Sequence, residues 1–252
     1  MQLRRQLGWK VDVSIGYDCA FARTPNVCYF NSVISRILFV VIASCLLVSC
    51  GKSESISYEI SVEIETPLGV RKGIAVRKIM HRFPPNLPSI GESKARLEMV
   101  GEAVVVDLGD QPSVYALLVG RDRSRQQSNW GMWALLHEQN PGIGDSIELW
   151  PNSPKTSAPR FEDLVPMFVM FTDEGVPETV TEVDPDDMSE VFGAGTRLKR
   201  ISVKETNKRP TDGIERRLPW LDNYPERRLD RDYKVSSSPT LPQWLWNLDF
   251  KR

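Results

Sequence analysis

The sequence predicts an α+β fold built mostly of antiparallel β-hairpins, with two short helices and an extended C-terminal tail. Three observations indicate this class. Residues 55–66 (SISYEISVEIET) alternate strictly between polar and apolar side chains, which is typical of a strand with one buried face. Further β-rich runs follow in pairs joined by turn residues. From residue 208 onward, proline and charged residues are frequent, which disfavours a packed element.

Each pair of β-rich runs is expected to form a hairpin. The first strand turns at residues 66–69 (TPLG) into a second run over residues 70–80, within which Gly73 indicates a bulge. The next run, residues 103–108, is nearly continuously apolar, as in a strand that is buried on both faces. The other expected strands are residues 114–119, two runs within residues 166–184, and residues 197–206.

Two helices are expected between these strands. Residues 128–142 (SNWGMWALLHEQNPG) place tryptophan, leucine and histidine on one helical face after a serine or asparagine cap. Residues 184–193 (DPDDMSEVFG) predict a shorter helix. Asp184 stands at its N-cap, Pro185 at its first position and Gly193 just past its end.

An apolar segment near the N-terminus predicts export. Fifteen residues separate Arg36 from Lys52, which corresponds to about 22 Å of helix. A membrane span needs about 20 apolar residues, whereas the apolar region of a secretory signal needs 7–15 after a basic residue. The segment is therefore expected to be a cleaved signal.

The end of this segment resembles the bacterial lipobox, through Leu47, Val48, Ser49, Cys50 and Gly51. The resemblance implies that the Cys50 thiol receives a diacylglyceryl group, that the chain is cut before Cys50, and that the new N-terminus is acylated. Two acyl chains suffice for stable membrane attachment. Glycine rather than aspartate after the cysteine resembles the signal for the outer membrane. We therefore expect a lipid-anchored protein of the bacterial cell envelope that faces the periplasm.

The cysteines agree with this expectation. All four, at positions 19, 28, 45 and 50, lie at or before the lipobox, so the body has no disulfide, thiolate zinc site or cysteine nucleophile. A leader of 49 residues is long for a signal, and the true start is expected at Val27 or Val33. The expected organisation is an untranslated or disordered leader (1–32), a lipoprotein signal peptide (33–49), a soluble α+β domain (50–207) and a C-terminal extension rich in proline, charge and tryptophan (208–252).

The charge balance of the body excludes an obvious nucleic-acid interface. Residues 1–49 hold five basic and two acidic side chains, which leaves 27 basic and 31 acidic side chains and a net charge of −4. Several segments within residues 62–221, among them VEIETPLGVRKG and EVDPDDMSEVFGAG, resemble a group of exported proteobacterial proteins. That resemblance implies no activity and no site residues.

No residue pattern of the body predicts a catalytic, cofactor or metal site. The two histidines, His81 and His137, lack the partners of a triad or a zinc motif, and are expected to be packed or exposed. The acidic run 184–190 departs from a calcium loop at Met188 and Ser189, so helix capping explains it better. A hydrolase that uses two carboxylates stays an alternative, and the carboxylates considered for it are Glu102, Asp107, Asp173 and Glu174.

Three tryptophans in the C-terminal extension, Trp220, Trp244 and Trp246, are the remaining candidates for an interaction. Large aromatic side chains in a polar segment act as anchors, either on the protein's own sheet or on a partner. We therefore expect a binding or scaffolding protein, more than an enzyme, with the membrane and an envelope protein as partners. A module that binds sugar or cell wall through these tryptophans is a further alternative.

Overall fold

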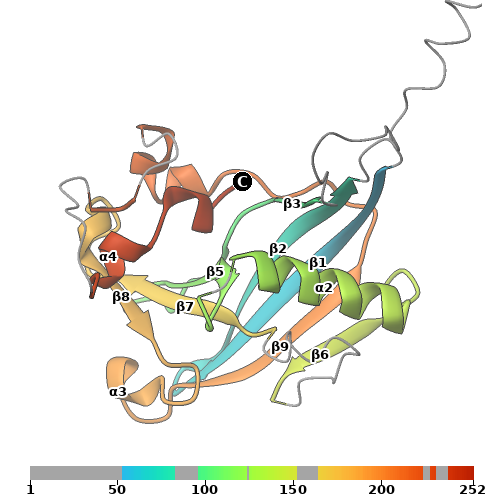
Figure 1. The fold of residues 1–252 in the computed structure, drawn as a ribbon. Helices are drawn as coiled ribbons and strands as arrows, with labels where there is room; N and C mark the ends of the chain where they lie inside the picture. Colours follow the sequence, from blue (N-terminus) through green and yellow to red (C-terminus); the bar gives the residue numbers. More distant parts are fainter. Residues whose placement is uncertain (1–52, 83–95, 124, 152–163, 224–227, 231–237) are drawn as a thin grey trace, which may run out of the picture. The chain divides into compact units, whose positions relative to one another are not determined.

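The computed structural model describes residues 53–82, 96–123, 125–151, 164–223, 228–230 and 238–252, all within the unit Gly51–Arg252 (Figure 1). The strands are β1 (Ser53–Thr66), β2 (Gly69–Arg82), β3 (Arg96–Val100), β4 (Val104–Val106), β5 (Val114–Gly120), β6 (Ser146–Trp150), β7 (Pro166–Phe171), β8 (Val180–Val183) and β9 (Arg197–Glu205). The helices are α2 (Arg125–Gln139), α3 (Ser189–Phe192) and α4 (Leu241–Trp244), with 3₁₀ turns η1 (Pro177–Thr179), η2 (Ile214–Arg216), η3 (Pro219–Asn223) and η4 (Asn247–Asp249).

The strands form two antiparallel sheets, which confirms the mostly antiparallel α+β class. The first sheet has the strand order β3-β2-β1-β9-β6, and the second has the order β4-β5-β7-β8. Three of the expected hairpins are present, because β1 pairs with β2, β4 with β5, and β7 with β8. Strands β3 and β6, which close the two edges of the first sheet, were not predicted.

The β1–β2 hairpin is the longest element of the fold and follows directly from the alternating sequence. Its pairing runs without interruption from Ser53 opposite Arg82 to Thr66 opposite Gly69. At the turn, the Thr66 hydroxyl donates to the Gly69 carbonyl at 2.8 Å and accepts from the Leu68 N–H at 3.2 Å. Gly69 adopts a positive φ of 116°, which few other residues tolerate.

The prediction of a bulge at Gly73 is wrong. Gly73 pairs in register with Val62, and its glycine serves a close approach between the two sheets. A Cβ at this position would lie 2.2 Å from the Val105 carbonyl oxygen and 2.8 Å from a Val104 methyl group. Glycine is needed because the backbone of β4 crosses here, which is the other common reason for glycine inside a strand.

Substitution of Gly73 by alanine is therefore expected to destabilise the fold by at least about 2 kcal/mol, since neither backbone can yield without breaking pairs. Chemical denaturation should show this as a lower midpoint with an unchanged slope. Gly175→Ala is the matched control, because its Cβ would meet only the side chain of Asp173, at 3.2 Å. Equal stabilities of the two variants would contradict the close packing of β2 on β4.

Two hydrophobic cores lie on opposite faces of the second sheet. Val114, Ala116 and Leu118 of β5 belong to the core between the sheets. Tyr115 and Leu117, which alternate with them, belong to a second core on the other face. All seven residues of β5 are buried as a result, and β7 alternates between the two cores in the same way. Residues 103–106 are covered on both sides as well, because Val104 and Val106 belong to the first core while Ala103 and Val105 face the second, but the strand ends at Val106 and Asp107 is exposed.

The C-terminal segment, residues 208–252, supplies the cover of this second core, so an extended tail is not confirmed. Seven of its described apolar side chains are buried in the same core as Tyr115, Met167 and Phe171. The last residues also pair with the sheet region, because the Ala103 N–H donates to the Phe250 carbonyl at 2.7 Å. The buried members from this segment are Ile214, Leu218, Trp220, Leu221, Leu229, Leu245 and Phe250.

Both predicted helices exist, but their starts differ from the prediction. Helix α2 begins at Arg125, so Asn129 lies inside it and is buried rather than capping. Helix α3 has only four residues, and its N-cap is Met188. The Asp184 carboxylate instead accepts from the Asp186 N–H at 2.9 Å, which caps a separate turn before the helix. The helix end at Gly193 is confirmed, with a positive φ of 85°.

Candidate functional site

The residues expected to carry the lipid, Cys50 and its neighbours Leu47, Val48, Ser49 and Gly51, lie outside the described residues. Within the described part of the chain, the helices are too short or too polar to cross a membrane. The expectation of a lipid anchor therefore stays a prediction from the sequence.

The three candidate tryptophans occupy different environments. Trp220 is only 6% exposed, contacts Phe171 and Phe250, and donates its indole N–H to the Glu174 carbonyl at 2.9 Å. Its ring is thus part of the second core, and a partner could not reach it without opening that core. Trp244 and Trp246 are half-buried. The guanidinium of Arg123 lies 5.6 Å from the ring centroid of Trp244, and that of Arg228 lies 5.6 Å from the ring centroid of Trp246. The three rings do not form one exposed strip.

The carboxylates considered for hydrolysis have structural partners. Glu174 accepts from the buried Tyr115 hydroxyl at 2.6 Å, and burial with this contact raises the pKa of Tyr115. Asp107 accepts from Gly109 at 2.8 Å and pairs with Arg217 at 2.9 Å, and these contacts lower its pKa. Asp173 accepts from the Gly175 N–H, and Glu102 from the Ile214 N–H.

The two histidines meet around one tryptophan of α2. His81 is 8% exposed and lies edge-on to Trp133, with ring centroids 5.2 Å apart, and to Trp130 at 5.4 Å. His137 is exposed and stacks on Trp133 at 6.1 Å. Packed and exposed histidines were expected, and these contacts with aromatic rings account for both.

Among the described residues, three carboxylates lie close enough together to bind a cation, and the ammonium group of Lys251 pairs with two of them. Oxygen atoms of Glu102, Asp212 and Glu215 lie within 4.8 Å of one another. The Lys251 ammonium group pairs with Asp212 at 2.5 Å and also with Glu215. This contact lowers the pKa of Asp212. The group therefore fixes the C-terminal residues against the segment that follows β9.

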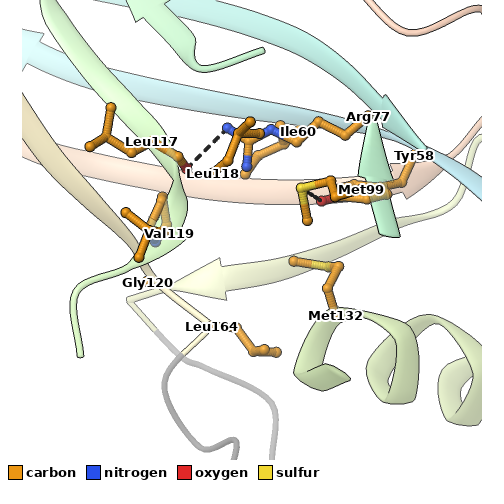
Figure 2. A pocket seen from close by; sticks show the side chains of 11 residues that line it. Tyr58, Ile60, Arg77, Met99, Leu117, Leu118, Val119, Gly120, Met132 and Leu164 are labelled. Carbon is orange, nitrogen blue, oxygen red and sulfur yellow. Dashed lines mark hydrogen bonds between the residues drawn. The ribbon is translucent and has the colours of Figure 1, made fainter. Parts of the chain in front are cut away.

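A buried arginine links the two sheets beside a very small cavity (Figure 2). Arg77 of β2 is 4% exposed and donates to the carbonyls of Glu102 (3.1 Å), Ala116 (2.9 Å) and Leu117 (3.2 Å). The pairing of β5 with β7 is irregular between Ala116 and Gly120, so the guanidinium serves carbonyls where the regular ladder is interrupted.

The cavity is lined by two buried titratable groups and is too small to bind a substrate. Burial lowers the pKa of Arg77 and raises that of Tyr58, whose hydroxyl donates to the Met99 sulfur at 4.0 Å. The cavity volume is about 20 Å³. Since a single water needs about 10–15 Å³ by such a measure, the cavity is too small for a substrate. Arg77 is a structural residue.

The best candidate for a binding site is a groove at the tip of the β1–β2 hairpin, with a volume of about 240 Å³. Leu108 and Phe192, 4% and 5% exposed, contribute buried side chains to it, whereas Leu68 at its side is 79% exposed. The remaining lining residues are Thr66, Pro67, Gln111 and Thr196. None of the lining residues is charged, so the groove suits an apolar side chain with a few hydrogen-bonding groups near it.

A second, larger depression is lined by four charged residues, Arg121, Glu182, Asp184 and Glu190, and by four apolar ones, Phe168, Val183, Pro185 and Val191. Two of the charged lining residues form ion pairs with neighbours outside the depression, Arg121 with Asp186 at 3.1 Å and Glu182 with Arg123 at 2.8 Å. The neutral groove at the hairpin tip is therefore the better docking site for an apolar group.

The outer face of β1 carries cross-strand ion pairs that make the sheet sensitive to acid. The Glu59 carboxylate accepts from Lys208 at 2.7 Å and Lys204 at 2.9 Å, and only 7% of the Glu59 side chain is exposed. The hydrogen bond from Lys208, with that from Lys204, lowers the pKa of Glu59. Because the folded pKa lies below the unfolded one, this contact stabilises the fold above the unfolded pKa, about 4.3.

The contribution of Glu59 should be lost as the pH falls through its folded pKa. Glu59→Gln is therefore expected to lower stability at pH 7, and to flatten the loss of stability between about pH 5 and pH 3. Urea unfolding at a series of pH values measures both effects. Glu148→Gln, on an exposed side chain of β6, is the control. If the stability of Glu59→Gln fell with decreasing pH as steeply as that of the wild type, the lysine contacts would not act on stability.

In comparisons with known proteins, no family model, no curated protein sequence and no solved structure matches this chain.

Proposed function

We propose that this protein is a lipid-anchored protein of the bacterial cell envelope. Lipid on Cys50 holds it on the periplasmic side of a membrane, in particular the outer membrane. Its body binds or scaffolds a partner at the tip of the β1–β2 hairpin. The lipobox-like residues 47–51 and the apolar segment before them support the anchor.

The position of the groove relative to the start of β1 supports the binding role. Cys50 precedes Ser53 by three residues, so at most about 11 Å of chain separates the lipid from the sheet. Strand β1 then runs for 14 residues, which is about 43 Å of extended chain, before the turn that lines the groove. An anchor at one end of β1 leaves the apolar groove at the other end, where a partner away from the anchor can reach it.

Site-specific photocrosslinking in intact cells tests this proposal. A benzophenone side chain at Leu68 should give a discrete adduct with an envelope protein, and Cys50→Ala should abolish that adduct. The control position is Ile143, which is 68% exposed but lies in the loop after α2. Absence of an adduct at Leu68, or equal adducts at Leu68 and Ile143, would contradict binding at the hairpin tip.

A further inference from the structure

The edge of β2 near the hairpin tip is open. One edge of β2 pairs with β1 along its whole length, but the other edge pairs with β3 only from Lys78 to Arg82. Towards the hairpin tip, the next residue whose backbone groups face this edge is Val76. Thr211 covers it, because the Thr211 N–H donates to the Val76 carbonyl at 2.9 Å and the Thr211 hydroxyl accepts from the Val76 N–H at 3.1 Å.

Three further residues must present their backbone groups on this same edge. Because the backbone groups of an antiparallel strand alternate in direction, the N–H and C=O of Ile74, Lys72 and Val70 point the same way as those of Val76. In the described part of the chain, no residue forms a backbone hydrogen bond with these groups. Val70, Lys72 and Ile74 form the open edge of β2.

The side chains of the open edge are accessible as well. Val70 and Ile74 are 47% and 49% exposed, so their apolar side chains can be reached from solvent. Natural proteins usually cover or shorten such an edge, because it is a template for another strand. The opposite face of β2 is closed at Gly73 by β4, so an incoming strand would meet the outer face, with Val70 and Ile74 on it, and a free row of backbone groups.

The charges at the open edge select the kind of strand that fits. Lys72 stands between the two apolar side chains, pairs with Glu63 at 3.2 Å, and stays 46% exposed. Glu63 also pairs with Arg200 at 3.1 Å, so it keeps a cation if Lys72 turns towards a ligand. A second copy of the chain, paired symmetrically about Lys72, would place two lysines opposite each other, which is unfavourable. A carboxylate opposite Lys72 is favourable for the same reason.

We propose that the open edge of β2 binds an extended acidic peptide segment of a partner protein, which adds to the first sheet as a further strand. The segment carries a carboxylate opposite Lys72 and apolar side chains opposite Val70 and Ile74. Beyond Val70 it approaches the hairpin turn, whose residues Thr66, Pro67 and Leu68 also line the groove. This inference rests on the proposed binding role and names the class of partner.

The test uses the full-length chain in a mild detergent and two fluorescent nine-residue peptides. Both alternate valine and threonine, with glutamate at the centre of one and lysine at the centre of the other. By fluorescence anisotropy, the wild type should bind the glutamate peptide about two- to fivefold more tightly, the range of an exposed ion pair. Lys72→Glu should reverse this preference. Lys199→Glu, at the β9 bulge on the far side of β1, should leave it unchanged.

Two further measurements report the strand itself. The glutamate peptide should slow hydrogen exchange of the Lys72 and Ile74 amides. Ile74→Pro should abolish binding, because it removes an edge N–H, while a proline on an open edge leaves the pairing with β1 intact. Its thermal unfolding is compared with that of the wild type. No peptide binding, an unchanged preference in Lys72→Glu, or concentration-dependent dimerisation through this edge would overturn the proposal. If peptide binding fails while crosslinking at Leu68 persists, only the open edge is wrong and the binding role stands.

Discussion

Replacing Phe250 by alanine is expected to lower the free energy of unfolding by about 3–5 kcal/mol, the usual range for a buried phenylalanine. Phe250 is fully buried, with ring centroids 5.7 Å from Phe171 and 5.6 Å from Trp220. The loss would be large because the second sheet depends on the C-terminal segment to cover its outer core. Urea unfolding followed by tryptophan fluorescence measures it.

Leu248→Ala is the matched control for this prediction, since Leu248 is a half-buried neighbour two residues earlier in the chain. Its expected loss is about 1 kcal/mol, as for an incompletely buried apolar side chain. Similar small losses in both variants would contradict the assignment of residues 208–252 to the core. They would favour the extended tail that composition predicts.

Arg77→Met is expected to cost about 3 kcal/mol or more, although methionine fills much of the same volume. The substitution leaves the carbonyls of Glu102, Ala116 and Leu117 without the donor that satisfies them, at about 1–3 kcal/mol for each buried group left unpaired. Denaturant unfolding of the variant measures the loss.

Lys78→Met, at the next position of β2 and only half-buried, is the control for Arg77. It should change stability by less than about 1 kcal/mol. If Arg77→Met were as stable as this control, the guanidinium would not be needed at the interrupted β5–β7 ladder.

The elements that could be predicted are those whose signal is local. Strand β1 alternates from Ser55 to Thr66, and the turn at Thr66 and Pro67 follows from turn chemistry, so the hairpin was predictable. Strands β3 and β6 were not, because each has only five residues and no clear alternation of its own, and β6 also pairs with β9, which is about 50 residues further along the chain. Their existence depends on the partner strand more than on their own pattern.

The role of the C-terminal segment could not be read from its composition. Leu218, Leu229 and Phe250 are buried, but they stand among charges and prolines with no helical or strand period. The indication that the C-terminal segment is packed lies in two strands of the second sheet. Strands β5 and β7 are apolar on both faces, which requires a covering layer on each side, and the predicted hairpins and helices supply only one.

The candidate site divides in the same way. The lipobox is a linear motif, so Cys50 could be proposed from the sequence alone. The groove joins the hairpin turn with Leu108 and Phe192, which are far apart in sequence, so only the fold brings them together. The open edge of β2 depends on where β3 ends, and no residue of β2 itself reports that.

Mass spectrometry of the N-terminus of the native protein tests the central claim most directly. The envelope fraction of wild-type cells should contain a chain that begins at Cys50 and carries a diacylglyceryl group and an amide-linked acyl chain. Cys50→Ala should lose both the modification and retention in the membrane fraction. An unmodified chain that still carries residues 37–49 would contradict lipid anchoring through Cys50, and with it the proposed place of the hairpin tip in the envelope.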